Sequence, residues 1–561
     1  MDIRRLVLYF LLVFIGMSLW NQWQAEHKPT TATQQQQSAA SNSNQYDYVP
    51  TGFDNNSASS AAASTTKSRR IAETTLAPQG DLIHVTTDLL NVAINTVGGN
   101  VVSAALIKYP VSVDEKDTPV RILSPSTSRL YVAESGLTNL NNNKPLTYQA
   151  TAKSYQLQSG QQQLQVVLTA HADGLEIKKT YTFTRDRYAI GLNYQVTNHT
   201  NKAWSGSLYA QLKRRNVPVD SSILHVQRSY MGAAYYTPHK PYQKLSYSGM
   251  DDNNLDLAVP GGWVAMQQHY FLSTWVATQN ETNRYYSHVA TPHFNTGSDH
   301  VYTIGFVEPK QTVEPGQTAT SSATLYVGPE TEKRLAALAK GLDLTIDYGW
   351  LWPISKLIFW VMSHIHQFIG NWGWSIVFTT LLIKLIFFKL TESSFMSMAK
   401  MRELTPRIQS LRERYGDDRQ KLGQATMELY KKEKINPLGG CLPILIQIPV
   451  FIALYYVLIE SVELRQAPFI FWIHDLSVKD PYYVLPILMG LSMFLQQRLS
   501  PAPPDPMQAK LFMFMPLMFV IFFMSFPAGL VLYWLANNCT QAAQQWYVMK
   551  KYEKRKQQKS R

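Results

Sequence analysis

The sequence predicts a multi-domain α+β membrane protein with six transmembrane helices and a large extracytoplasmic antiparallel β-sandwich. Three observations predict this fold class. Apolar segments long enough to cross a bilayer lie at the start of the 561-residue chain and again beyond residue 371. Residues 76–330 instead alternate apolar and polar side chains, as half-buried strands do. Two segments dense in Lys and Arg, at 396–434 and 549–561, would lie on the same side of the membrane if the chain had six spans. This division excludes a uniformly soluble enzyme and a disordered protein.

The N-terminal segment combines two basic residues with an apolar run. Arg4 and Arg5 precede the apolar residues 6–20, a pattern that cleaved signal peptides share with uncleaved anchors. No small-residue cleavage motif follows the run, so we interpret residues 1–23 as a transmembrane anchor that begins in the cytoplasm. Residues 24–75 are rich in Gln, Ser, Ala, Asn and Thr. Such a stretch buries too little apolar area to offset its chain entropy, so we expect a flexible low-complexity linker.

Residues 76–330 carry the β-sandwich signal. Tyr181-Thr-Phe-Thr and Leu192-Asn-Tyr-Gln-Val alternate, and Gly98-Gly99, residues 139–143 and Ser159-Gly160 mark turns. Many short strands separated by turns are typical of a sandwich. Several histidines occur in this domain without metal-ligand spacing, for example His239, His269, His288, His293 and His300. The sequence predicts no metal site, no cofactor and no chemistry for this domain.

The C-terminal third contains five further candidate spans, at 372–391, 441–459, 482–497, 511–527 and 529–547. Residues 331–371 are expected to connect them to the sandwich through helices that lie in the membrane interface. Lys356, Ser363 and Gln367 recur at spacings of seven and four within 351–369, hence on one helical face. A single polar face is typical of an interfacial amphipathic helix rather than of a span.

Charge sidedness supports this topology. Ten basic residues lie between positions 396 and 434, within a predicted helical hairpin at 392–437. Short loops rich in Lys and Arg stay in the cytoplasm, as does the basic tail at 549–561. Both termini are then cytoplasmic and the sandwich is outside. The hairpin has two open interpretations, a solvated topology anchor or a docking arm for nascent chains, ribosomes or anionic lipid heads.

Polar residues interrupt the predicted spans. Lys384 lies in the middle part of 372–391, where a lysine costs about 2.5–3.5 kcal/mol on insertion scales. It either faces a protein cavity or extends to the cytoplasmic surface, and Lys389 suits the second alternative better. Further polar residues on the spans are Thr380, Gln447, Gln496, Gln497, Asn537, Asn538 and Gln541. Each of these could make an ordinary interhelical hydrogen bond, but together with the lysine they predict a hydrophilic groove. No carboxylate lies within a span, which argues against a proton-driven transporter.

Several motifs resemble the YidC membrane protein insertases of Gram-negative bacteria, within the YidC/Oxa/Alb family. They run in order along the chain: Gly262-Trp-Val-Ala-Met-Gln-Gln-His-Tyr-Phe-Leu, Asp347-Tyr-Gly-Trp-Leu-Trp, Met398-Ala-Lys-Met-Arg, Asn436-Pro-Leu-Gly-Gly-Cys441, Leu454-Tyr-Tyr, Ser461-Val-Glu-Leu-Arg-Gln-Ala-Pro-Phe, Trp472-Ile-His-Asp-Leu-Ser, Asp480-Pro-Tyr-Tyr, Leu485-Pro-Ile-Leu-Met-Gly and Gly529-Leu-Val-Leu-Tyr-Trp. The resemblance implies a five-helix insertase core around a groove that opens to cytoplasm and lipid. It also implies an inner-membrane location and a periplasmic sandwich that resembles sugar mutarotases without being enzymatic.

The resemblance further implies a function and a site. Such an insertase inserts and helps to fold nascent inner-membrane proteins, alone or with the Sec translocon, without a chemical reaction or cofactor. The family typically has an arginine where this sequence has Lys384, so the positive charge is kept and the planar fork is lost. Thr380 and Tyr533 match groove-lining positions, and Trp534 lies beside them. The expected substrate groove comprises Lys384, Thr380, Gln447, Tyr533, Trp534 and Asn537.

The expected partners are nascent membrane proteins, Sec translocon components and membrane lipids. The basic cytoplasmic loops add the ribosome and the signal-recognition-particle receptor, and no specific nucleic acid is expected. Two rival classes make different predictions. A secondary transporter or channel predicts solute flux and inverted repeats. A carbohydrate-active outer domain on an anchor predicts paired carboxylates in a cleft and leaves five spans unexplained.

Overall fold

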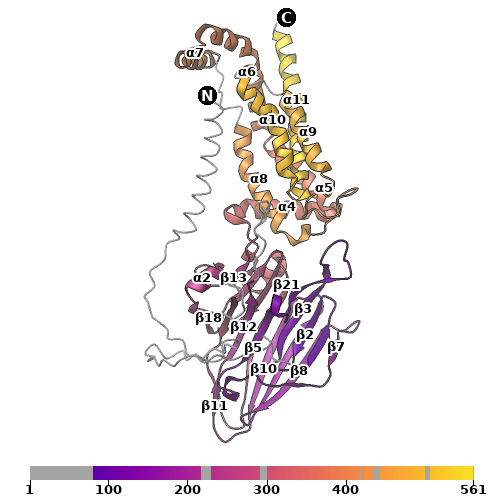
Figure 1. Cartoon of the computed structure of the whole chain (residues 1–561), viewed down its shortest axis with the longest axis vertical. Helices are drawn as coiled ribbons and strands as arrows, with labels where there is room; N and C mark the ends of the chain where they lie inside the picture. Colours follow the sequence, from indigo (N-terminus) through magenta and orange to yellow (C-terminus); the bar gives the residue numbers. More distant parts are fainter. Residues whose placement is uncertain are drawn as a thin grey trace.

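The computed structural model describes residues 80–216, 229–290, 300–416, 418–433, 442–499 and 506–559. The expected anchor at 1–23 and linker at 24–75 lie outside these residues. Figure 1 shows a β-domain at one end of the molecule and a helical region at the other. The predicted antiparallel sandwich and helical C-terminal region are therefore confirmed.

Two large sheets face each other in the β-domain. Within the described residues, the ten-stranded sheet runs in the order β15 (Asp256–Pro260), β18 (Thr282–Ala290), β19 (Val301–Val307), β12 (Leu208–Arg215), β5 (Tyr131–Leu137), β3 (Asn100–Pro110), β2 (Leu90–Asn95), β1 (Leu82–Thr86) and β7 (Ser154–Gln156), and β4 (Pro119–Leu123) pairs with β3. The nine-stranded sheet runs β14 (Gln243–Leu245), β13 (Gly232–Tyr235), β16 (Trp263–Gln268), β17 (Phe271–Val276), β21 (Thr318–Pro329), β10 (Ala189–Asn198), β9 (Leu175–Thr184), β8 (Gln163–Ala172) and β6 (Gln149–Ala150). A small sheet pairs β11 (Trp204–Gly206) with β20 (Gln311–Val313). The pairings are antiparallel except that of β1 with β7.

The core of the β-domain lies between the two large sheets. Strand β9 buries every second side chain from Leu175 to Phe183, as its alternating sequence predicts. Lys179 belongs to this buried row, which hydropathy did not reveal. Its Nζ atom donates hydrogen bonds to the carbonyl oxygens of Gly98 and Ser135, at 3.1 Å each. Burial holds the pKa of Lys179 well below its usual value.

Short helices connect the sandwich to the helical region. They are α3 (Glu332–Leu338), the 3₁₀ turns Leu342–Thr345 and Gly349–Leu351, and α4 (Trp352–Ile369), whereas α2 (Tyr247–Asp252) lies within the β-domain between β14 and β15. Helix α4 lies at the junction of the two parts (Figure 1) and packs against α5 and α8. It ends because Gly370 adopts a positive φ of 71°, which glycine tolerates without strain. Asn371 then caps α5 by accepting a hydrogen bond from the Trp374 backbone at 3.1 Å.

The junction is a packed interface with polar ties. Arg465 follows α8 and donates from Nη2 to the carbonyl oxygens of Pro110 and Val111, at 2.8 and 2.9 Å. The Nε2 atom of His269 lies 3.0 Å from the carbonyl oxygen of Ile459. A single buried apolar cluster continues from the sandwich into the helices. The sandwich is therefore held directly against the loop that joins α8 and α9.

The helical region comprises α5 (Trp372–Ile386), α6 (Phe388–Tyr415), α7 (Arg419–Lys432), α8 (Leu442–Glu460), α9 (Val484–Leu499), α10 (Pro506–Phe523) and α11 (Ala528–Lys559). Within the described ranges, no single helix has both the length and the apolar composition to cross a membrane. The bent pair α5 and α6 meets that criterion together, with a 69° bend at the break. The helices α6 and α7 form the expected hairpin shape, at the end of the molecule remote from the sandwich (Figure 1).

Two predicted helix boundaries are wrong. The segment 372–391 was expected as one helix, but α5 ends at Ile386 and α6 begins at Phe388. No proline or glycine marks this break. Gln544, distant in sequence, donates to the Phe388 carbonyl oxygen at 3.0 Å, a contact that hydropathy cannot reveal. The segments 529–547 and 549–561 were expected as a span and a separate tail, but α11 continues to Lys559. The stretch beyond 547 consists mainly of good helix formers and lacks Gly and Pro, so nothing local ends the helix.

Candidate functional site

A hollow lies between α5, the start of α6, α8 and α11. Apolar side chains from these helices are joined in the lining by a small number of polar groups, which come from all four helices. The lining residues are Thr380, Ile383, Lys384, Phe387, Leu390, Thr391, Gln447, Val450, Tyr533 and Asn537. An apolar hollow with a few convergent polar groups is the usual form of a binding site.

Lys384 is the charged group of this hollow. It is 9% exposed, and its Nζ atom donates to Oε1 of Gln447 at 3.1 Å and to Oε1 of Gln541 at 3.2 Å. No carboxylate within the described residues forms an ion pair with it. A buried ammonium is normally paired with an anion, because removing a charge from water is costly. Here neutral amide oxygens satisfy two of its three donors and leave its charge uncompensated.

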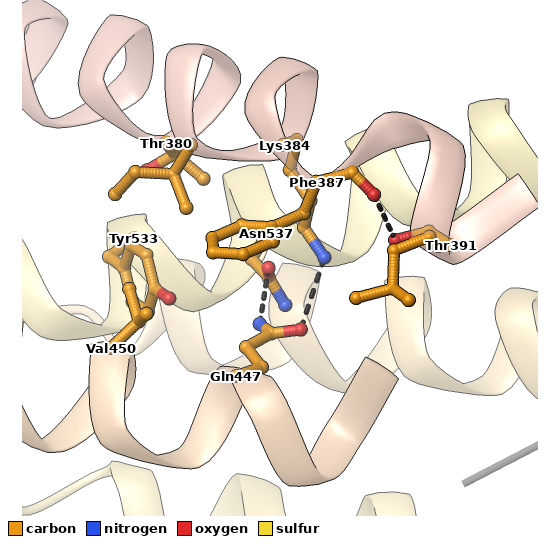
Figure 2. A pocket seen from close by; sticks show the side chains of 10 residues that line it. Thr380, Lys384, Phe387, Thr391, Gln447, Val450, Tyr533 and Asn537 are labelled. Carbon is orange, nitrogen blue, oxygen red and sulfur yellow. Dashed lines mark hydrogen bonds between the residues drawn. The ribbon is translucent and has the colours of Figure 1, made fainter. Parts of the chain in front are cut away.

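The Gln447 amide links Lys384 to α11. Its Nε2 atom donates to Oδ1 of Asn537, while its oxygen faces Lys384 (Figure 2). Tyr533 lies one turn before Asn537 on α11 and stacks on Phe451 of α8, with 6.1 Å between ring centroids. Three helices thus converge on one polar cluster.

Two threonines line the hollow, and the hydroxyl of each already donates its hydrogen to a backbone carbonyl oxygen. Thr380 Oγ1 donates to the Ile376 carbonyl oxygen at 2.7 Å, and Thr391 Oγ1 donates to the Phe387 carbonyl oxygen at 3.0 Å. Each hydroxyl therefore offers the hollow only acceptor capacity. Thr391 belongs to the hollow because the chain bends at Phe387 (Figure 2).

The structure brings together most of the expected groove residues. Lys384, Thr380, Gln447, Tyr533 and Asn537 all line the hollow, whereas Trp534 does not. Trp534 instead packs against Phe451, Phe523 and Phe519, at centroid distances of 4.8, 5.3 and 6.1 Å. Adjacent residues on a helix point about 100° apart, so Trp534 points in a different direction from Tyr533.

Sequence reasoning missed two groups of this site. Gln541 was noted only as one polar residue among several, yet it is the second partner of Lys384. Its position four residues after Asn537 places both on one face of α11, and that spacing could have identified it. Thr391 carried no such signal, because its place depends on the bend between α5 and α6.

The chemistry of the hollow is that of non-covalent binding. It offers an ammonium, two amides, a phenol and two hydroxyl acceptors beside apolar walls. Within the described part of the chain, no group of three His, Cys, Asp or Glu side chains is placed to hold a metal ion. The arrangement suits a polar or anionic segment of a larger apolar molecule.

Both parts of the chain match known families. Residues 82–361 match the model described as YidC periplasmic domain, and residues 364–556 match 60Kd inner membrane protein. The class is thus an inner membrane protein with a periplasmic domain. "Membrane protein insertase YidC" of Coxiella burnetii (strain Dugway 5J108-111) is 56% identical over 99% of this chain and 98% of its own length. The protein of that name from Legionella pneumophila (strain Paris) is 47% identical over the same shares.

The chain belongs to the YidC family of membrane protein insertases, and its function is membrane protein insertion. A solved structure titled "Active YidC insertase crystal structure with the first transmembrane domain resolved" is 16% identical, with a TM-score of 0.38, over 83% of this chain and 92% of that one.

Proposed function

We propose that the hollow around Lys384 receives the polar segment of a nascent membrane protein while the adjoining apolar segment enters the lipid. The observation that carries this proposal is the buried ammonium of Lys384, which has amide partners but no carboxylate partner among the described residues. Such a charge attracts an anionic or strongly polar group without having to break an existing ion pair. The groove residues are Lys384, Thr380, Gln447, Tyr533, Asn537 and Gln541.

The proposed insertion is driven without a chemical reaction, so the proposed activity is not enzymatic. Polar groups that must cross a bilayer lose their water, and hydrogen-bonding groups in the hollow reduce that cost. Burial of the substrate's apolar segment in lipid supplies the driving force, at roughly 25 cal/mol per Å². The faces of α9 and α10 that would guide this segment expose large apolar side chains, including Leu491, Leu495, Leu517, Met518 and Ile521.

The proposed topology has six spans, with both termini in the cytoplasm and the sandwich in the periplasm. The spans are the N-terminal anchor, the bent α5–α6 pair, α8, α9, α10 and the first part of α11. The hairpin and the sandwich occupy opposite ends of the helical region (Figure 1), which supports a membrane between them. Helix α4 would lie in the periplasmic interface, where its exposed Trp360 and Phe368 suit lipid contact.

The proposed partners follow from this topology. Nascent chains would enter from the cytoplasm, delivered by ribosomes or the signal-recognition-particle receptor near the basic hairpin α6–α7. Sec translocon components would contact the spans or the sandwich when the two act together. Anionic lipids would contact the basic cytoplasmic surfaces.

The test is insertion in a defined system. The purified full chain is reconstituted into liposomes, and a small single-span substrate with an acidic translocated tail is synthesised in vitro. Protein-dependent protection of that tail from added protease is the expected result. Absence of protection by folded protein would contradict unaided insertion, and restoration by a co-reconstituted Sec translocon would restrict the proposal to joint action.

A further inference from the structure

Asn537, Gln447 and Lys384 form a linear chain of hydrogen bonds across the hollow. Asn537 Oδ1 accepts from Gln447 Nε2, and Gln447 Oε1 accepts from Lys384 Nζ at 3.1 Å. The three side chains come from α11, α8 and α5 and point toward one another in Figure 2. Gln541 supplies a second oxygen to Lys384 at 3.2 Å.

The hydrogen bonds that link Asn537, Gln447 and Lys384 all run in one direction, with each donor on the side of Lys384 or Gln447 and each acceptor on the side of Asn537. An ammonium only donates, so Lys384 requires the oxygen end of the Gln447 amide. A glutamine amide can rotate by half a turn, which would place its NH₂ group against the ammonium and lose the contact. Asn537 opposes this rotation because its oxygen accepts only from the nitrogen end of Gln447.

From this geometry we infer that Asn537 is a positioning residue, which orients Gln447 so that Lys384 is held in the hollow with its charge uncompensated. The inference rests on the proposed function, because it concerns how the groove's cation is presented to substrate. Gln447 and Gln541 immobilise the ammonium without neutralising it, and one N–H donor remains for a substrate carboxylate. A charged hydrogen bond to that carboxylate would favour substrates with acidic tails.

The adjacent asparagine supplies a matched control. Asn538 is also on α11 and is 4% exposed, the same as Asn537. Its Nδ2 atom donates to Ser492 Oγ of α9 at 3.1 Å, away from Gln447. Asn538→Leu therefore tests the loss of a buried amide in this helix without changing the Asn537–Gln447 contact.

The experiment measures charge preference in proteoliposomes. Two substrates differ only in Asp or Asn at the same positions of the translocated tail, and the readout is the ratio of their insertion yields. The wild-type chain is expected to prefer the Asp substrate, and Lys384→Met to lose that preference. Asn537→Leu should lower the ratio by roughly threefold, the scale of one interhelical hydrogen bond in a membrane. Asn538→Leu should leave the ratio unchanged.

A double variant identifies the route of the effect. If Asn537 acts through Gln447, the pair Gln447→Leu and Asn537→Leu together should lower the ratio no further than Gln447→Leu alone. Additive losses would show that Asn537 acts independently and would overturn the inference. Should Asn537→Leu fail to fold, Asn537→Ala allows the same comparisons without added bulk.

The outcomes separate the inference from the proposed function. A ratio unchanged in Asn537→Leu but lost in Lys384→Met overturns the positioning role alone. A ratio unchanged in both variants overturns the electrostatic part of the proposed function, and with it this inference.

Discussion

The Nζ atom of Lys551 lies 2.7 Å from the Oε1 atom of Glu392, so the far part of α11 is tied to the first turns of α6. Tyr552 adds a second tie by donating to Glu403 Oε2 at 3.0 Å. The contact at Glu392 lies close to the bend at Phe387, a residue that lines the hollow, whereas Glu403 lies about four turns further along α6. The C-terminal helix is therefore tied to α6, the helix that leads from the hollow into the basic hairpin.

Loss of the ion pair between Lys551 and Glu392 should make the first turns of α6 open more often. The two side chains are 35% and 23% exposed, and a partly solvated pair of this kind contributes up to about 1 kcal/mol. We expect Lys551→Met to speed amide hydrogen exchange at the start of α6 by up to roughly fivefold, measured by mass spectrometry. High salt should have a similar effect on the unmodified chain. Lys550→Met, at the neighbouring exposed position, is the control, and equal exchange in both variants would contradict the prediction.

The charge of Lys384 should matter more than its shape. Lys384→Arg keeps the charge, and we expect it to insert an acidic-tailed substrate about as well as the unmodified chain. Lys384→Ala removes the charge and should reduce insertion of that substrate by roughly three- to tenfold. A neutral-tailed substrate should be affected less. Protease protection in proteoliposomes measures both yields. Equal loss with Arg and Ala would show that the groove needs the lysine geometry instead.

Gly373 is required for the contact between α5 and the loop after α8. A Cβ atom at this position would lie 2.1 Å from Cδ2 and 2.4 Å from Cγ of Phe469. Gly373→Ala should therefore lower the free energy of unfolding by about 1–3 kcal/mol. The midpoint of thermal unfolding in detergent is the measurement, and Phe469→Leu should rescue it partly. Gly423→Ala on α7 is the control, because no atom lies within 4 Å of the added carbon. A similar change in both variants would argue against the steric explanation.

The sandwich should lose stability as pH rises through the weakly acidic range. Glu308 is 1% exposed, and burial raises its pKa from 4.5 to about 7, although Thr278 donates a hydrogen bond to its carboxylate. Between these two values the folded chain binds more protons than the unfolded chain, so the free energy of unfolding falls with rising pH. The loss is largely complete near pH 7 and amounts to roughly 3 kcal/mol.

Glu308→Gln should reduce this pH dependence by the share that Glu308 contributes, because an amide has no proton to lose and can still accept from Thr278. Other carboxyl groups whose pKa values burial also raises, including those of Glu330 and Glu463, keep the remainder. Thermal unfolding of the full chain between pH 4.5 and 8 measures the slope. Glu314→Gln, at an exposed position, removes the same charge without the burial. A slope that is as steep in Glu308→Gln as in Glu314→Gln would contradict the assignment.

Those parts of the fold that depend on local sequence patterns could be predicted from the sequence. Alternation in residues 181–184 and 192–196 predicted strands, and β9 and β10 include them with the alternate burial expected. The break at Phe387 was not accessible, because no proline or glycine marks it and the hydrogen bond beside it joins residues 388 and 544, which are distant in sequence. The burial of Lys179 was missed for the same kind of reason, since its carbonyl partners at Gly98 and Ser135 are distant in sequence.

Some features of the candidate site could likewise be predicted from the sequence, and others depend on the tertiary structure. The sequence alone determined that this chain carries a lysine among apolar residues, that amide side chains occur on other apolar segments, and that its motifs resemble one family of insertases. Only the tertiary structure decided that Gln447 and Gln541 hydrogen-bond Lys384, that Asn537 accepts a hydrogen bond from Gln447, and that Trp534 packs elsewhere. Hydropathy and motifs report the chemistry of each residue and its near neighbours. Hydrogen-bond partners across three helices depend on helix rotation and bending, which the packing of the whole chain sets.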